Sequence, residues 1–318
     1  MDNFSKLPEG CVSLILSMTA PRDACRLSAI SSLFNAAADS DSLWESFLPS
    51  DYRQILSRSV SPVVFSTKKQ LFFSLCESPP LLDGGKLSFA LDRESGKKCY
   101  TLPAREVAIA GKEDPRYWKW ISLPEPRFLL PKSRFSEAAH LLSGWCLDIW
   151  GRINTTMLSV NTSYAAYLIF KIADTWRTEF KFPLKASVTF VKEGEDEYED
   201  DKSSTVFLTF QPFRRRGERE NGRLPQMRRD GWMEIELGEF YNDEGDDGEV
   251  EMRLKELREW KAGLIVVGIE VRPKVCGSIE RKSHHARCGD VAWRGPPYGE
   301  PWRDRRCGAA VACTSMTF

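Results

Sequence analysis

The sequence is poor in residues that could carry out catalysis. It holds three histidines, His140, His284 and His285, and only the last two are adjacent. It contains no Gly-x-Ser-x-Gly, no phosphate-cradling glycine motif and no His-Glu-x-x-His, which are the patterns that hold a nucleophile, a phosphate or a zinc ion. Nothing else in the sequence indicates a cofactor. We therefore expect a protein that binds other molecules, not an enzyme.

Two runs of like charge could attract a partner. An acidic run covers residues 193–201, and a basic loop extends from Arg214 to Arg229. The acidic run could attract a basic substrate but is more typical of a solvated hairpin tip. The basic loop could serve nucleic-acid binding or nuclear import, but it lacks interleaved aromatics, which favours a flexible loop. Because Lys plus Arg equals Asp plus Glu, at 45 each, we expect neither nucleic acid nor membrane as a partner.

Nine cysteines fall into two groups. Five lie among apolar neighbours and are interpreted as small core residues: Cys11, Cys25, Cys76, Cys99 and Cys146. Four lie in residues 275–318, where no Cys-x-x-Cys pair occurs, which argues against a zinc site. That tail has no helical or strand period. We predict a disordered tail, with a gene-model artefact as the alternative.

Residues 7–48 alternate short helical patterns with turn signals, which predicts three short helices. Pro8 suits the first turn of a helix, because a missing N–H costs nothing there. Apolar residues then recur at helical spacing: Val12, Ile15 and Leu16 in the first helix, Leu27 and Ile30 in a second that begins at Pro21, and Leu33, Phe34 and Ala37 in a third that Ser31 or Ser32 can cap. Leu43 to Leu48 close the unit. Such a small core either packs on the rest of the chain or is partly buried by a partner.

This segment resembles the F-box motif in its plant form. The resemblance rests on Leu7-Pro8-Glu9, Ile15-Leu16, Pro21-Arg22-Asp23, Leu27-Ser28, Leu33-Phe34 and Trp44-Glu45-Ser46-Phe47-Leu48-Pro49, in that order. It implies an F-box over residues 1–50 that binds a Skp-type adaptor and, through it, a cullin scaffold. The implied adaptor-binding residues, which divide between internal core and adaptor contact, are Leu7, Pro8, Ile15, Leu16, Leu27, Leu33 and Phe34. Docking of this kind places apolar anchors of a helix in a groove.

Helical character continues through residues 51–85, a predicted helical linker that ends near Asp83-Gly84-Gly85. The apolar period then changes from 3.6 to 2. The predicted strands are Cys99–Leu102, Arg105–Ile109, Tyr117–Ile121, Trp145–Ile153, Ala165–Ile172, Ala186–Val191, Thr205–Phe210, Met233–Leu237 and Leu264–Val271. They indicate an α+β multidomain chain, whose second domain, residues 86–274, is an antiparallel β-sandwich. Glu251–Trp260 fits either a strand edge or a short helix.

The second domain resembles the phloem-lectin domains of the Nictaba-like type. The resemblance covers residues 87–274 and includes Tyr117-Trp118-Lys119-Trp120-Ile121, Gly231-Trp232-Met233-Glu234-Ile235-Glu236 and Gly263-Leu264-Ile265-Val266-Val267-Gly268. It implies a β-sandwich of jelly-roll type. The prototype of that family binds chitin oligomers and N-glycan cores, and an F-box followed by this lectin domain is a known plant architecture.

A sugar site needs an aromatic face for the ring and polar groups for the hydroxyls. The resemblance implies two tryptophans seven residues apart, of which this chain keeps Trp118 and has Gly111 in place of the other. Trp118 is the first candidate for carbohydrate binding. Trp232, Glu234 and Glu236 are further candidates, although alternation could also place them on a solvated face. The missing tryptophan predicts weak glycan binding or none.

Two functions follow as expectations. The first is the substrate-recognition subunit of an SCF ubiquitin ligase, in which the F-box docks the adaptor and the sandwich recruits a protein or glycoprotein target. The alternative is a carbohydrate-binding lectin, for N-glycans or GlcNAc oligomers, that acts independently of ubiquitylation. Since residues 1–6 lack the basic region of a secretory signal and no span of about 20 apolar residues exists, we expect the cytoplasm or the nucleus.

Overall fold

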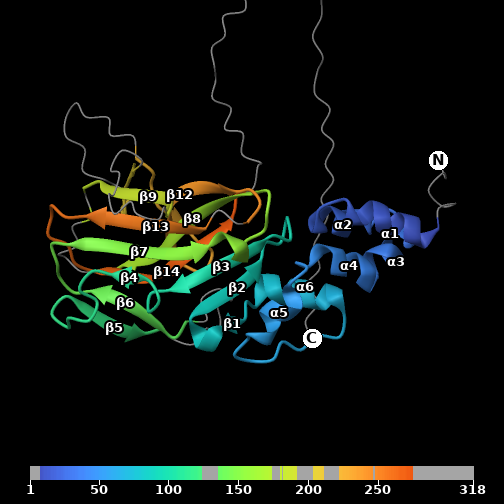
Figure 1. Cartoon of the computed structure of the whole chain (residues 1–318), viewed down its shortest axis with the longest axis horizontal. Helices are drawn as coiled ribbons and strands as arrows, with labels where there is room; N and C mark the ends of the chain where they lie inside the picture. Colours follow the sequence, from blue (N-terminus) through green and yellow to red (C-terminus); the bar gives the residue numbers. More distant parts are fainter. Residues whose placement is uncertain are drawn as a thin grey trace, which may run out of the picture. The chain divides into compact units, whose positions relative to one another are not determined.

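The computed structural model describes residues 8–123, 135–173, 180, 182–191, 203–210, 222–245 and 248–274. Leu7, the acidic run 193–201, residues 214–221 of the basic loop and the tail 275–318 lie outside the described residues. The described part combines short helices with two antiparallel β-sheets (Figure 1), which confirms the predicted α+β architecture. None of its helices has the length and apolar character needed to cross a membrane.

Among the described residues, four short helices form the N-terminal module, one more than the sequence predicts. They are α1 (Glu9–Ser17), α2 (Pro21–Leu27), α3 (Ser32–Asp39) and α4 (Asp41–Phe47). Pro21 occupies the first turn of α2, and Ser31 caps α3 by accepting a 3.3 Å hydrogen bond from the backbone N–H of Phe34. The core of the module contains Val12, Leu16, Ala24, Phe34, Ala37, Ala38 and Leu43. The predicted helix starts at Pro21 and Ser31 are therefore confirmed.

Trp44 on α4 joins this module to the rest of the chain. Its indole is fully buried, and Nε1–H donates a 2.6 Å hydrogen bond to the carbonyl of Ala38. The ring centroid lies 5.2 Å from the rings of both Phe72 and Phe73 on α6 (Lys68–Glu77). With α5 (Tyr52–Ser57), α6 supplies the helices predicted within residues 51–85. Their buried side chains belong to the same hydrophobic core as the sheets, so this segment is packed and does not act as a tether.

The described strands form a β-sandwich of two sheets (Figure 1). The order in the larger sheet is β1–β2–β3–β14–β8–β12–β11, with β6 pairing β14 and β5 pairing β6, and the order in the smaller sheet is β10–β9–β13–β7–β4. The larger sheet comprises β1 (Leu81–Leu82), β2 (Leu87–Leu91), β3 (Lys98–Pro103), β5 (Trp118–Ser122), β6 (Glu137–Leu141), β8 (Thr162–Ile172), β11 (Gln226–Met227), β12 (Met233–Asn242) and β14 (Leu264–Pro273). The smaller comprises β4 (Ala108–Ile109), β7 (Leu147–Asn154), β9 (Leu184–Phe190), β10 (Ser204–Val206) and β13 (Glu249–Glu256). Gly151 on β7 lies against Leu102 and Ile269 of the larger sheet, which is where the two layers meet.

Several stretches differ from the prediction. Thr205–Phe210 is a strand only as far as Val206, and β2 and β6 were not among the predicted strands. Glu251–Trp260 was expected at a strand edge or in a short helix, but β13 pairs with β7 on one side and β9 on the other and is therefore a central strand. Val250, Met252 and Leu254 are buried at a period of 2, with charged residues between them on the less buried face. Arg105–Ile109 forms a strand only at its last two residues, because the backbone N–H groups of Glu106 and Val107 turn back to the carbonyl of Pro103.

Strand β14 needs a glycine in its middle. It pairs with β3, β8 and β6, and its register against β8 shifts between Val266 and Gly268, which marks a β-bulge. A Cβ atom at Gly268 would lie 2.0 Å from the carbonyl oxygen of Leu102, on the backbone of β3. Backbone cannot move aside as a flexible side chain can. The close approach of β3 and β14 therefore depends on the absence of a side chain at this residue.

We predict that Gly268→Ala lowers the free energy of unfolding by at least about 2 kcal/mol, because the added methyl group forces β3 away from β14. Urea denaturation of the purified chain measures the loss. Gly144→Ala is the matched control, since its Cβ would meet Leu141 Cδ1 at 3.5 Å, an ordinary contact. Equal stabilities for the two variants would contradict the assignment.

Candidate functional site

The N-terminal helices divide their apolar residues between a core and an exposed surface. Val12 and Leu16 on α1 are fully buried in the core of the module. Four large apolar side chains of the module remain exposed to solvent, three at α1 and one in the turn after α2, and we call them together the helical apolar surface: Leu14 (59% exposed), Ile15 (43%), Met18 (79%) and Ile30 (66%). Leu14 and Ile15 are spaced four and three residues before Met18, so these three lie on one side of α1. The side opposite the core therefore presents apolar groups to water.

The predicted adaptor-binding residues are separated by this division. Ile15 and Pro8 are exposed, Leu27 and Leu33 are half-buried against the helical core, and Leu16 and Phe34 are buried within it. Leu7 lies outside the described residues. Leu16 and Phe34 therefore belong to the buried core of the module and are not available for direct contact with a partner. Ile15 is exposed, although its helical spacing with Val12 and Leu16 predicted one apolar stripe. Ile30, predicted within the second helix, is exposed in the turn after α2.

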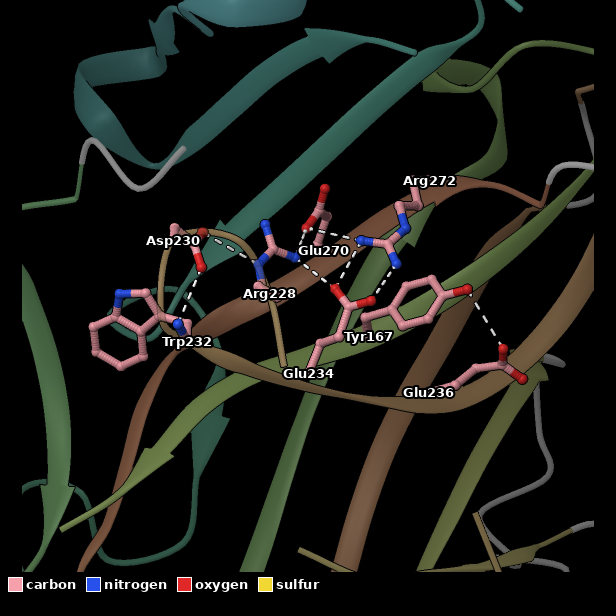
Figure 2. A network of polar contacts seen from close by, with 8 residues as sticks. All are labelled: Tyr167, Arg228, Asp230, Trp232, Glu234, Glu236, Glu270 and Arg272. Atoms are coloured by element: carbon pink, nitrogen blue, oxygen red, sulfur yellow. Dashed lines mark hydrogen bonds and ion pairs between the residues drawn. The ribbon is translucent and has the colours of Figure 1, made fainter. Parts of the chain in front are cut away.

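The face of the larger sheet carries a network of charged side chains (Figure 2). Tyr167 on β8 is paired in register with Glu236 on β12 and Glu270 on β14, so all three point to one face. Arg272 follows two residues later on the same face of β14, and its guanidinium lies 3.8 Å from the centre of the Tyr167 ring. Arg228 reaches the network from the turn between β11 and β12.

Glu234 is the centre of this network. One of its carboxylate oxygens accepts hydrogen bonds from Arg228 Nη1 at 2.7 Å and Arg272 Nη1 at 2.9 Å, and the other accepts one from Arg272 Nη2 at 2.5 Å. Arg228 Nη1 also lies 2.7 Å from Glu270 Oε2, and Arg228 Nε lies 3.3 Å from Asp230 Oδ2. Both oxygens of Glu234 are thus occupied inside the protein. Such an arrangement holds three neighbouring strands and a turn together.

The pKa of Glu234 follows from this geometry. Burial alone would raise the pKa of the carboxyl group, because it penalises the charged form. The hydrogen bonds and charges of Arg272 and Arg228 outweigh that effect, and the pKa is lowered. The carboxylate therefore stays charged at neutral pH and serves as a structural anion. Glu236 is also engaged, since it accepts a 3.4 Å hydrogen bond from Tyr167 Oη and pairs with Arg223 Nε at 3.4 Å.

The predicted carbohydrate residues do not form one open site. Trp118, the first candidate, is only 3% exposed, and its Nε1–H donates a 3.1 Å hydrogen bond to the carbonyl of Ala110. It is a core residue and offers no face to a sugar ring, so this prediction is wrong. Trp232 is half-buried, with the Lys171 ammonium 4.4 Å from its ring centre. Glu234 is buried and saturated, which removes it as a hydroxyl acceptor.

Gly111, which stands where the resemblance implies a second tryptophan, has φ of +72°. L side chains adopt this conformation rarely, because the Cβ atom crowds the backbone. The obstacle is the backbone conformation and not lack of space, since a Cβ there would meet the ring of Tyr117 at 3.6 Å, an ordinary contact. The loop that contains Gly111 is therefore suited to glycine, and restoring a tryptophan would require a different backbone conformation.

Several residues of the network and the helical surface were missed by sequence reasoning. Arg228 was placed in a flexible basic loop, yet its side chain is largely buried among carboxylates. Glu270 and Arg272 alternate with buried residues on β14 as Glu234 and Glu236 do on β12. The signal that could have found them is that charged residues alternate with apolar ones on both strands, and that Arg272 on β14 is opposite in sign to the glutamates of β12. In the part of the chain that the structure describes, no group of His, Cys, Asp and Glu could hold a metal ion.

Comparison with known families decides the identity of the two modules. The F-box domain family matches residues 4–46, and the phloem protein 2 family matches residues 97–273. The putative F-box protein PP2-B12 of Arabidopsis thaliana is 43% identical over 275 residues, which cover 86% of this chain and 98% of that protein. The chain belongs to the F-box proteins with a phloem protein 2 domain.

Other members of this family are similarly close. F-box protein PP2-B10 of Arabidopsis thaliana is 42% identical over 274 residues, which cover 85% of this chain and 94% of that protein. Both resemblances in the sequence, to the F-box and to the phloem lectins, are confirmed. Among solved structures, a family 35 carbohydrate binding module from Clostridium thermocellum covers 54% of this chain and 96% of its own, with 13% identity and a TM-score of 0.27. A TM-score this low carries no argument about function.

The lowered pKa of Glu234 predicts how the stability of this F-box protein depends on pH. Its charged form contributes stability that is complete above the unfolded-state pKa of roughly 4.3 and is lost as pH falls through the lower folded-state pKa. Glu234→Gln should therefore cost about 2 kcal/mol at pH 7, because two partly buried guanidinium groups lose one of their carboxylate partners and keep only Glu270 in common. The difference from the unmodified chain should shrink as the pH falls below about 4.

Glu239→Gln on the same strand is the matched control. Glu239 is paired with Lys274 at the surface, and we expect its loss to cost less than about 1 kcal/mol. Urea denaturation at a series of pH values measures both variants, since urea is uncharged and does not screen the ion pairs. A cost for Glu234→Gln that does not change with pH would contradict the role of its charge.

Proposed function

We propose that this protein is the substrate-recognition subunit of an SCF-type ubiquitin ligase. In this proposal, the F-box helices dock a Skp-type adaptor, which connects them to a cullin scaffold, and the lectin-like sandwich recruits a protein or glycoprotein target. The observation that carries the proposal is the helical apolar surface, Leu14, Ile15, Met18 and Ile30. It lies on the module that matches the F-box family.

The energetics of this surface suit a partner. Burying a large aliphatic side chain contributes about 1.5–3 kcal/mol relative to leaving it in water. Four such side chains on a stable helical core can supply the anchors that dominate an interface. The core residues Leu16 and Phe34 hold α1 against α3, so the anchors are presented in one arrangement before the partner binds. Less conformational entropy is then lost on docking.

The protein needs no chemistry of its own in this role. By holding a target on one module and the adaptor on the other, it raises the effective concentration of the target near the ligase. The family it belongs to is one of adaptors and lectin-like domains, which points to a non-catalytic protein. We further propose that it works in the cytoplasm or the nucleus, which fluorescence microscopy of the tagged full chain would test.

The lectin alternative has lost its predicted residues. Trp118 is buried, and Glu234 is saturated by arginines. Trp232 and Glu236 remain partly accessible but are already in contact with charged neighbours. No observation on these four residues favours a sugar over a protein as the ligand. We therefore propose target recruitment through a protein surface.

We predict that the double variant Ile15→Lys with Met18→Lys weakens binding to a recombinant Skp-type adaptor at least about tenfold, since it places two charges on the apolar anchors. Both side chains are exposed, and cations are favoured near the end of a helix, so the helices should remain folded. Isothermal titration calorimetry measures the affinity, and circular dichroism checks the fold.

The matched control is Val60→Lys with Val64→Lys. These valines are exposed in the segment between α5 and α6, away from the helical apolar surface. We expect this variant to bind the adaptor as the unmodified chain does. Undiminished adaptor binding by the α1 variant would refute the docking assignment.

A further inference from the structure

A second group of exposed apolar side chains lies on the sandwich, away from the sheet-face network. It consists of Tyr117 before β5, Leu142 and Trp145 between β6 and β7, and Leu257 and Trp260 between β13 and β14, and we call it the loop-end patch. Trp145 is 59% exposed and Trp260 is 44% exposed, although tryptophan side chains are highly buried on average. Apolar patches of this kind on soluble proteins commonly mark interaction sites.

Hydrogen bonds between the loops hold the patch together. Gly144 and Lys261 exchange two 2.8 Å backbone hydrogen bonds as an antiparallel pair. In this antiparallel register the next pair is Trp145 and Trp260, which are therefore cross-strand neighbours. Their rings meet edge to face with centroids 5.3 Å apart. The backbone N–H of Leu142 also donates a 2.8 Å hydrogen bond to the carbonyl of Tyr117. The two indoles are thus presented on a fixed backbone.

A buried ion pair beneath the loops reinforces this arrangement. Lys261 is only 3% exposed, and its ammonium contacts the carboxylate of Glu256 and donates a 2.8 Å hydrogen bond to the carbonyl of Trp145. The Glu256 carboxylate also accepts hydrogen bonds from two backbone N–H groups of the turn that follows β13. The side chain of Lys261 points inward while Trp145 and Trp260 point outward. The patch is therefore built by the fold and is not a frayed loop.

The charges around the patch indicate an uncharged occupant. Arg258 and Glu259, between Leu257 and Trp260, are exposed but adjacent and opposite in sign. Glu256 is paired with Lys261, and Arg253 Nε lies 2.7 Å from Asp148 Oδ1. No sign of charge prevails, which suits an occupant without net charge. A sugar would need several acceptors for its hydroxyl groups, and the carboxylates of Glu256 and Asp148 already have partners, which leaves Glu259 as the exposed carboxylate of this loop. Leu142 and Leu257, each three residues before one of the tryptophans in the same loops, are exposed, and such aliphatic side chains are better matched to apolar side chains than to hydroxyl groups.

The patch lies at the end of the sheet opposite the turn that contacts the helices. The β2–β3 turn reaches the F-box helices, where Glu94 pairs with Arg22 at 2.6 Å. The start of β3 is paired with the end of β14, since Tyr100 lies opposite Val271. The patch borders Leu264 at the start of β14, seven residues or roughly 23 Å along the strand. A partner on the patch would therefore not compete with the adaptor.

We propose that the loop-end patch is the surface on which the sandwich binds its target, and that the occupant is an uncharged polypeptide segment presenting large apolar side chains. The inference rests on the proposed function for naming the partner as a ligase target. The patch and the helical apolar surface are independent, so each can be tested without the other.

A phage-displayed library of random twelve-residue peptides, selected on the full chain, tests the proposal. We expect the selected peptides to be rich in Leu, Phe, Trp or Met. Labelled copies should bind at least about tenfold more weakly to Trp145→Ser with Trp260→Ser, measured by fluorescence anisotropy. Leu257→Glu, which leaves the indole pair in place, should also weaken binding. Met227→Ser, at an exposed apolar residue of β11, should not.

Two results would overturn the proposal. The first is that every selected peptide binds the patch variants with the same affinity as it binds the unmodified chain. The other is quenching of tryptophan fluorescence by chitotriose that disappears in the double variant, which would assign the patch to a sugar. Adaptor affinity is measured on the same variants and should be unchanged. If only the α1 variant loses adaptor binding, or if no form of the protein binds the adaptor, the result bears on the proposed function and not on the patch.

Discussion

The sandwich depends on how closely β14 can approach its neighbours. This strand forms ladders with β3, β8 and β6, and the bulge at Gly268 lets it do so while the backbone of Leu102 lies against it. Both features described on the sandwich adjoin this strand. Its first residues border the loop-end patch, and its last residues supply Glu270 and Arg272 to the charged network. One close backbone contact thus positions two features that are distant in sequence.

The charged network on the larger sheet illustrates why residue type alone does not identify a binding site. Trp232 followed by Glu234 and Glu236 has the residue types of a sugar site. Both carboxylate oxygens of Glu234, however, accept hydrogen bonds from Arg228 and Arg272. Removing a buried charge from water is unfavourable unless partners replace the solvent. Arg228 and Arg272 are those partners. The carboxylate of Glu234 therefore links the strands to one another and to the turn, and it is not left free to bind a ligand.

Local signals explain most of what the sequence predicted. Pro21 and Ser31 begin helices through their own backbone and side-chain chemistry, and strands with a clear period of 2 were found within a few residues. The failures concern tertiary context. Whether Trp118 faces the core or the solvent depends on which strands cover β5, and the burial of Arg228 depends on carboxylates from β12 and β14. Neither arrangement is encoded within a window of neighbouring residues.

Trp44 has a consequence for how such proteins can be divided or recombined. The F-box match ends at residue 46, but the indole that completes the module rests against Phe72 and Phe73. A fragment cut at the end of the sequence motif would carry a large aromatic side chain without its pocket. The smallest portable form of this F-box is therefore longer than its motif, and a chimaera that grafts it onto another receptor should bring α5 and α6 with it.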